Sequence, residues 1–153
     1  MLFALPVPQS VRVGLLGRVG AKAIDLALVV IVAALLPYPL GPIGGFLYSL
    51  LADGLPWKAL RGQSVGKKLL KLRVWSRARH APANLRDSAL RNAPIALATF
   101  FAIIPVWGWI ILVLVGMPLM AMEIYLMATA ETGHRLGDQM GDTEVLDLRE
   151  EAK

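Results

Sequence analysis

The stretch AKAIDLALVVIVAALL, residues 21–36, has the length and composition of a membrane-buried helix, but it contains an aspartate, Asp25. Hydrocarbon disfavours charged groups, so a carboxylate within such a segment normally faces the protein interior and has a partner or a function. Arg18 precedes it by two helical turns and lies on nearly the same helix face. Much of the fold and function therefore depends on what Asp25 does in apolar surroundings.

The composition of the 153-residue chain is that of an integral membrane protein. Hydrophobic residues make up 56% of it, whereas soluble domains are nearer 45–50% apolar. Residues 23–57 contain two charged side chains, both aspartates, and residues 92–130 contain one, Glu123. Each block is much longer than the roughly 20 residues that one membrane span needs. We predict an all-α integral membrane helical bundle, with one domain over residues 12–148 and short tails at 1–11 and 149–153.

A cleaved signal peptide is the competing interpretation of residues 12–36, because basic residues precede the apolar run. Asp25 interrupts that run, and Pro37-Tyr38-Pro39 follows where a cleavage site with small residues should lie. These features favour an uncleaved span. The chain has no cysteine, which excludes disulfides and thiol chemistry.

Turn residues divide both apolar blocks. PYPLGPIGG (37–45) is rich in proline and glycine, which predicts a hairpin with spans at 17–36 and 41–60. IPVWGW (104–109) contains tryptophans suited to a membrane interface, which predicts spans at 88–104 and 107–129. Four transmembrane helices in two hairpins are expected. A turn at 116–118, one long kinked helix, and a total of three spans stay open as alternatives.

The basic residues indicate the orientation. All 16 Lys and Arg residues fall within 12–22, 58–91 and 135–153, and the predicted outer turns contain none. The positive-inside rule then places both termini and the basic loop 58–87 in the cytoplasm of a multi-pass cell membrane protein. With three spans the C-terminal tail would lie outside. The basic loop is expected to contact anionic lipid headgroups rather than nucleic acid, because no aromatic-interleaved basic fold accompanies it.

Five short motifs follow one another along the chain. They are GRVGAKAID with Arg18 and Asp25, SLLADGL with Asp53, GQSVGKKLLKLRVW with Gly62, Gly66 and Lys67, LRNAPI with Arg91, and RLGDQMGDT with Asp138 and Thr143. Together they resemble the RDD family of small bacterial and archaeal membrane proteins, named for one arginine and two aspartates in the first two spans. Ser64 stands where threonine is common, and Gly141-Asp142 replaces an Ala-Gly pair. The resemblance implies structural roles for the motif residues Gly62, Gly66, Lys67, Asp138 and Thr143. Transport is the function usually proposed for the family.

Two segments near the predicted cytoplasmic face have the pattern of β-strands. LRVW (72–75) and TEVLDL (143–148) both alternate and are rich in residues that favour strands. We expect them to pair as a small two-stranded patch on the cytoplasmic face.

Three carboxylates are expected at one depth in the membrane. With a turn centred near Pro39, Asp25 and Asp53 are equally distant from it and lie at the same level. Glu123 falls at a similar level near the end of the last span. One interpretation is that Arg18–Asp25, and Asp53 with Arg91 or Lys58, are buried ion pairs that fix helix register.

The functional alternative is small-ion transport. Closely placed carboxylates cannot all ionise cheaply, and a group that takes either a proton or a cation is the minimum chemistry of a monovalent cation/proton exchanger. Asp53 is the expected exchanging group, because no basic residue lies within one turn before it, while Asp25 would stay charged beside Arg18. Such a small exchanger would need to form a homo-oligomer, for which glycines could permit close helix contact. The candidates are Gly41, Gly44 and Gly45.

A third interpretation is a non-transporting accessory or assembly subunit of a larger membrane complex. No enzyme, cofactor or metal site is predicted. His80 and His134 are solitary, and Ser64 lacks an adjacent base.

Overall fold

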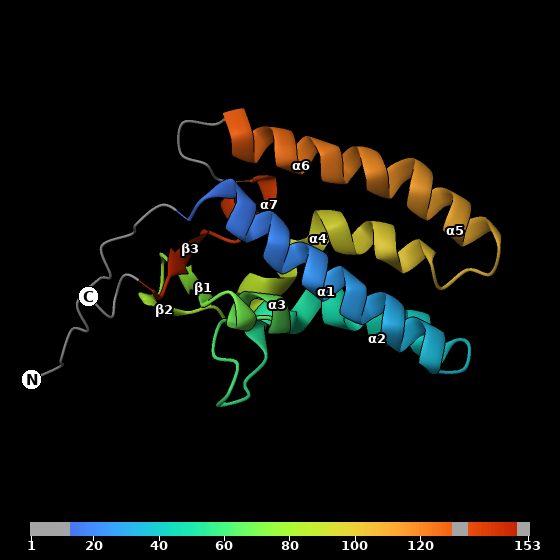
Figure 1. Cartoon of the computed structure of the whole chain (residues 1–153), viewed down its shortest axis with the longest axis horizontal. Coiled ribbons are helices and arrows are strands. Elements are labelled where there is room, and N and C mark those ends of the chain that lie inside the picture. Colours follow the sequence, from blue (N-terminus) through green and yellow to red (C-terminus); the bar gives the residue numbers. More distant parts are fainter. Residues whose placement is uncertain (1–12, 130–134, 150–153) are drawn as a thin grey trace, which may run out of the picture.

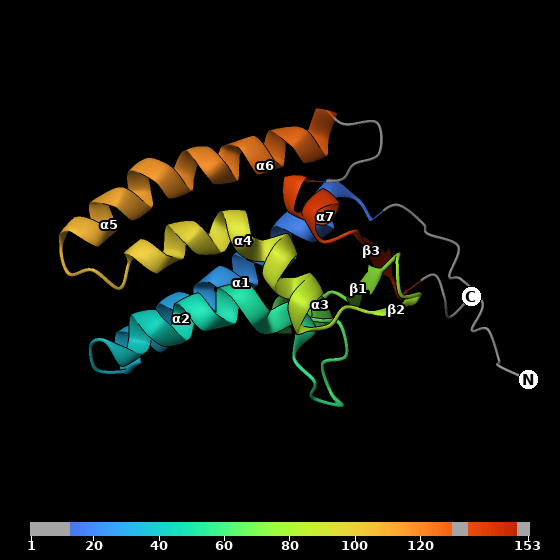
Figure 2. The same ribbon diagram turned by 180° about the vertical axis from the view of Figure 1, so that it is seen from behind.

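The computed structural model describes residues 13–129 and 135–149, which form a helical bundle with a small sheet at one end (Figure 1). The tails expected at 1–11 and 149–153 lie outside this range, apart from Arg149. The long helices run from the sheet towards two apolar turns at the opposite end, as the reverse view also shows (Figure 2).

The first hairpin consists of α1 (Leu15–Leu35) and α2 (Leu40–Leu51). The α1 helix lies where the sequence predicts it. The expected second span at 41–60 is too long, because the α-helix ends at Leu51 and tightens into a 3₁₀ turn, η1 (Ala52–Gly54). Gly54 lies against the backbone of Asn84, where a Cβ would approach the Asn84 carbonyl oxygen to 2.1 Å. Asp53 therefore lies on a terminal turn and not inside a helix.

The second hairpin consists of α4 (Leu85–Phe101) and one continuous helix made of α5 (Trp107–Ile111), a π-helical segment η2 (Leu112–Gly116) and α6 (Met117–Thr129). The alternative turn at 116–118 does not occur, because the helix passes through these residues. The apolar turns of the two hairpins contact each other, since the Tyr38 hydroxyl donates a hydrogen bond of 2.7 Å to the Ile103 carbonyl.

Glycines bring α1 and α2 together. A Cβ at Gly41 would lie 2.6 Å from the Ala33 carbonyl oxygen, and one at Gly45 would lie 2.8 Å from Val29. Gly44 has no atom of the described residues within 4 Å of its Cβ position. Two of the three glycines considered for contact between chains therefore serve packing within one chain.

The sheet and two short helices form the other end of the molecule. The elements are α3 (Val65–Leu69), β1 (Leu72–Ser76), β2 (Ala81–Pro82), α7 (Leu136–Met140) and β3 (Thr143–Asp147). The predicted pairing of the two longer strands is confirmed: β1 and β3 are antiparallel, with Val74 opposite Val145. The prediction of two strands missed a third one. The strand β2 pairs with the other edge of β1 and gives the order β2-β1-β3.

The polarity of the fold is reversed relative to a soluble domain. Large apolar side chains are exposed along the long helices, among them Val30, Ile31, Leu97, Phe100, Leu114 and Tyr125. The buried set is rich in polar and charged groups, among them Asp25, Asp53, Arg91, Asn92, Glu123, Arg135 and Asp138. Soluble monomers rarely expose such contiguous apolar surface. The distribution is that of a protein surrounded by lipid.

One of the described helices is long and apolar enough by itself to cross a membrane. This is the continuous helix Trp107–Thr129, of 23 residues. The α1 helix is of comparable length but carries Arg18, Lys22 and Asp25. The α2 and α4 helices, with 12 and 17 residues, extend only about 18 and 26 Å at 1.5 Å per residue.

Candidate functional site

The short helix α3 brings the basic loop back against the ends of α1 and α2. The turn before it depends on Gly62, whose φ of +75° is accessible to glycine and strained for other residues. Ser64 then caps α3, because its hydroxyl accepts a hydrogen bond from the Lys67 amide. Gly66 permits the close approach, since a Cβ there would lie 2.1 Å from the Ala21 carbonyl oxygen of α1.

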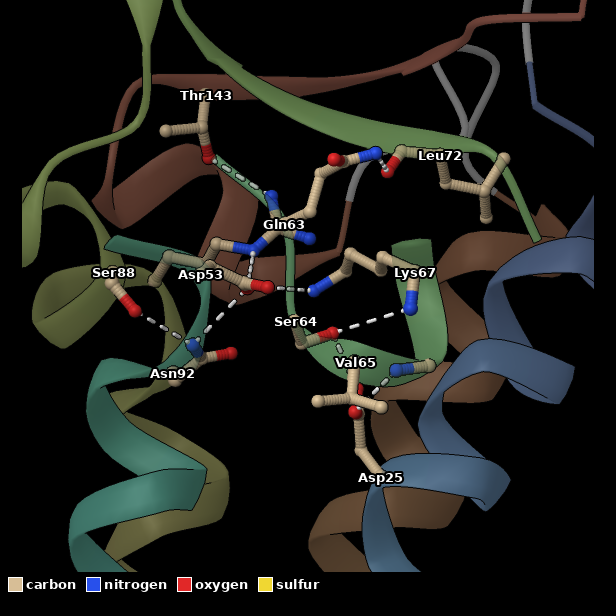
Figure 3. Close-up of polar contacts among 12 residues, drawn as sticks. Asp25, Asp53, Gln63, Ser64, Val65, Lys67, Leu72, Ser88, Asn92 and Thr143 are labelled. Atoms are coloured by element: carbon tan, nitrogen blue, oxygen red, sulfur yellow. Dashed lines mark hydrogen bonds and ion pairs between the residues drawn. The ribbon is translucent and has the colours of Figure 1, made fainter. Parts of the chain in front are cut away.

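Asp25 is held entirely by neutral donors. Its carboxylate accepts hydrogen bonds from the Tyr48 hydroxyl at 2.8 Å and the Gly66 amide at 2.8 Å. It also accepts one from the Ser64 hydroxyl at 2.6 Å (Figure 3). The side chain is buried, and within residues 13–129 and 135–149 it forms no ion pair. The predicted pair between Arg18 and Asp25 is wrong, because Arg18 reaches across to Asp138 on α7 instead.

Asp53 is ion-paired on both sides. It contacts the Lys67 ammonium of α3, and its other oxygen lies 3.2 Å from Nε of Arg91 on α4. The Asn92 amide also donates to it at 3.3 Å (Figure 3). Of the two partners proposed from the sequence, Arg91 is present. Lys58 is exposed and forms no ion pair among the described residues. Lys67 pairs with Asp53 in its place.

Asp138 joins three arginines from different parts of the chain. Its oxygens lie 2.9 Å from Arg91, 3.2 Å from Arg18 and 3.3 Å from Arg135. Burial alone would raise the pKa of Asp138, but the three guanidinium groups outweigh this and hold it below its ordinary value. This side chain is therefore the anionic centre that joins α1, α4 and α7.

Glu123 is attached to the same network through Arg135. The Arg135 guanidinium lies 3.1 Å from one Glu123 oxygen and donates to the Asn92 carbonyl oxygen at 3.1 Å. The second Glu123 oxygen is buried with no hydrogen-bond partner among the described residues. Thr143 at the start of β3 accepts a hydrogen bond of 3.2 Å from Arg91, which connects the network to the sheet.

Lys67 is the titratable cation of this network. Burial lowers its pKa to about 8 from an ordinary 10.5, because Arg91 and Arg135 partly offset the attraction of Asp53. The proton on Lys67 is thus more weakly held than on an exposed lysine.

A cavity of about 260 Å³ lies between the four long helices, and its polar end is formed by these groups. Asp25, Tyr48, Ser64, Asp53 and Lys67 line that end. The remainder is lined mostly by aliphatic and methionine side chains, together with the polar residues Lys22, Ser49, Asn92 and Thr99. The structure thus brings Asp25 and Asp53 to one cavity. Glu123 lines an adjoining cavity of about 150 Å³ together with Arg18, Arg91 and Arg135.

Several residues of the site were not identified from the sequence. Tyr48, Asn92 and Arg135 bind the carboxylates, and Lys67 was assigned only a motif role. Tyr48 could have been recognised, because its hydroxyl lies within an apolar span, five residues before Asp53 and on the side of the hairpin turn. No local feature of the sequence indicates the partners of Asp138, because they depend on where α7 docks.

The comparisons with known proteins identify one family. The sequence model of the RDD family matches residues 12–143, which is most of the chain and includes every element from α1 to the first residue of β3. No curated protein and no solved structure matches the chain. Family membership and the exposed apolar helix together indicate a membrane protein. By this match, which carries all the motifs that form the site, the chain belongs to the RDD family.

Proposed function

We propose that this protein exchanges a monovalent cation for a proton, and that Asp25 is the exchanging group. One observation carries the proposal. Asp25 is a buried carboxylate on a cavity between the helices, and it forms no ion pair among the residues that the structure describes, although Lys22 lines the same cavity. The other carboxylates of the network, Asp53, Asp138 and Glu123, each pair with at least one base. The expectation that Asp53 exchanges ions is thereby replaced.

The groups around Asp25 are compatible with both the cation-bound and the protonated state of its carboxylate. Alkali cations are hard ions that take oxygen ligands. Tyr48 and Ser64 each have a hydroxyl that donates to the carboxylate now and that can rotate to present a lone pair to a bound cation. When a proton replaces the cation, the carboxyl group becomes neutral and needs no counter-ion in the low-dielectric interior. The Gly66 amide holds the carboxylate in place in both states.

The proposal includes a topology with four spans in the cell membrane. The α1, α2 and α4 helices and the Trp107–Thr129 helix would cross it, and the short α2 would require local thinning of the bilayer. The sheet, α3 and α7 would lie in the cytoplasm, where the basic loop contacts anionic headgroups. Support comes from the apolar exposed faces of these helices and from the ion pairs that α3 and α7, the short helices beside the sheet, form with Asp53 and with Arg91 of α4.

Ion flux in proteoliposomes tests the proposal. A sodium or potassium gradient is imposed on vesicles containing the full-length protein, and the internal pH is followed with a dye. We expect cation-driven proton movement with the natural chain and none with Asp25→Asn. Glu144→Gln removes a partly exposed carboxylate of the sheet and should leave the flux unchanged. Flux that persists in Asp25→Asn would contradict the assignment of Asp25.

An accessory role in a larger membrane complex is the alternative that the same experiment addresses. It predicts no flux above that of empty vesicles from protein whose fold has been verified. In that case Asp25 would serve only to fasten α3 to α1.

A further inference from the structure

The smaller of the two cavities, between α1 and α6, differs from the first in its charge. It is lined by five basic residues and a single carboxylate, Glu123. The basic residues are Arg18, Lys22, Lys67, Arg91 and Arg135. Four of these bases form ion pairs with Asp53, Asp138 or Glu123, whereas Lys22 forms none within residues 13–129 and 135–149 and is the base available to an anion.

Lys22 is the base of this lining that lacks an ion pair among the described residues, although Asp53, Asp25 and Glu123 attract it from a greater distance. It lies on α1 and lines both cavities. Among the residues that the structure describes, its ammonium forms no hydrogen bond and no ion pair, whereas Lys67 is paired with Asp53 and Arg135 with Glu123. A lysine ammonium in apolar surroundings normally pairs with an anion or with another polar group. An anionic ligand would supply that partner.

Beside its charged groups, the smaller cavity has apolar walls that reach the exposed surface. Ala23 and Leu26 of α1 and Ile124 of α6 line the smaller cavity and are also exposed. The cavity therefore continues to the outer apolar face between these two helices. Lys22 lies seven residues into α1, which places it about 10 Å from the sheet end of that helix. A headgroup at this level and an acyl chain along α1 and α6 would both match their surroundings.

We propose that this cavity binds an anionic phospholipid, with the headgroup phosphate at Lys22 and an acyl chain against Leu26, Ile124 and Met127. Basic pockets between membrane helices near the cytoplasmic face bind acidic headgroups in other proteins. A phospholipid fits better than a soluble anion because most of the lining is apolar and the opening faces lipid. The proposal requires that the chain lies in a bilayer, but it does not depend on ion exchange.

Native mass spectrometry of the delipidated full-length protein tests this site. The probes are dioleoyl-phosphatidylglycerol, which is anionic, and dioleoyl-phosphatidylcholine, which has the same chains and no net charge. We expect the natural chain to retain the anionic lipid in preference. A charge-assisted hydrogen bond accounts for about a tenfold difference in affinity, so Lys22→Gln should reduce binding by that factor. Lys58→Gln removes the same charge at an exposed site and should bind as the natural chain does.

Two further arms make the result specific. Lys22→Arg keeps the charge and should retain the anionic lipid, which separates loss of charge from loss of fold. Inorganic phosphate and oleate are added as competitors, and we expect neither to displace the phospholipid at equal concentration. The proposal is overturned if both lipids bind equally, if Lys22→Gln binds phosphatidylglycerol like the natural chain, or if phosphate or oleate displaces it.

Discussion

At the residue scale, Asp25 and Asp53 have different surroundings although both line the same cavity. Asp53 neutralises two buried cations, Lys67 and Arg91, and Asp25 accepts three hydrogen bonds from neutral groups. Removing the charge from Asp53 leaves two cations without this counter-ion. Removing it from Asp25 breaks no ion pair. The two substitutions should therefore differ in their effect on stability even though they are chemically identical.

The Asp53→Asn substitution should strongly destabilise the protein. Breaking a buried ion pair by removing one partner costs about 3–5 kcal/mol. The Glu144→Gln substitution breaks a partly exposed pair with Arg77, for which the cost is about 1 kcal/mol or less. Thermal unfolding in detergent, followed by tryptophan fluorescence, compares the two variants with the natural chain. Equal melting temperatures for both variants would show that Asp53 is not a structural centre.

Lys67 should make stability depend on pH in the alkaline range. Its pKa of about 8 in the folded chain lies below the ordinary 10.5, so between these values the unfolded chain binds a proton that the folded chain has released. The contribution of Lys67 to the free energy of unfolding therefore increases as the pH rises from about 8 to 10.5. The melting temperature of the natural chain, relative to Lys67→Gln, should increase over this window. Parallel curves for the two proteins would contradict the lowered pKa.

At the element scale, the position of α3 against α1 determines the geometry around Asp25. Two of the three groups that hold the carboxylate, Ser64 and Gly66, come from the start of this short helix. A helix of five residues has little stability of its own. It is held by its cap, by the hydrogen bonds to Asp25 and by the close contact at Gly66.

The Gly66→Ala substitution tests this contact. The added Cβ would meet the Ala21 carbonyl oxygen at 2.1 Å, so α3 must move and the hydrogen bonds to Asp25 must lengthen. Overpacking of this kind costs about 1–3 kcal/mol, and the melting temperature should fall. The matched control is Gly44→Ala in α2, where the Cβ position is open and the same change favours the helix by up to about 1 kcal/mol. A Gly66→Ala protein as stable as Gly44→Ala would refute the close contact.

At the scale of the whole molecule, the sequence predicts the long helices and two of the strands, but not the short helices α3 and α7, the strand β2 or how the elements meet. Long apolar blocks and their proline- and glycine-rich breaks identify α1, α4 and the Trp107–Thr129 helix, because composition over about 20 residues reflects membrane burial directly. Alternation identified β1 and β3. The end of α2 was misplaced by several residues, because Asp53-Gly54 closes it through a contact with Asn84 that is distant in sequence.

The ion pairs also depend on contacts between elements that are distant in the sequence. Arg18 and Asp25 share a helix face, which made them the natural pair on spacing alone. In the folded chain Arg18 pairs with Asp138, 120 residues away, and Asp25 faces α3. Helical periodicity gives a side chain's direction, but the partner depends on which element docks opposite. The docking of α3 and α7 had no local signal.

The most direct test of the exchange mechanism is proton release by the purified protein when a cation is added. Sodium or potassium chloride is titrated into weakly buffered, detergent-solubilised protein over a range of acidic to neutral pH, with choline chloride as the control salt. If one carboxylate binds either a proton or a cation, the natural chain should release up to about one proton per chain, and Asp25→Asn should release none. Equal release from both proteins, or none beyond that with choline, would contradict exchange at Asp25.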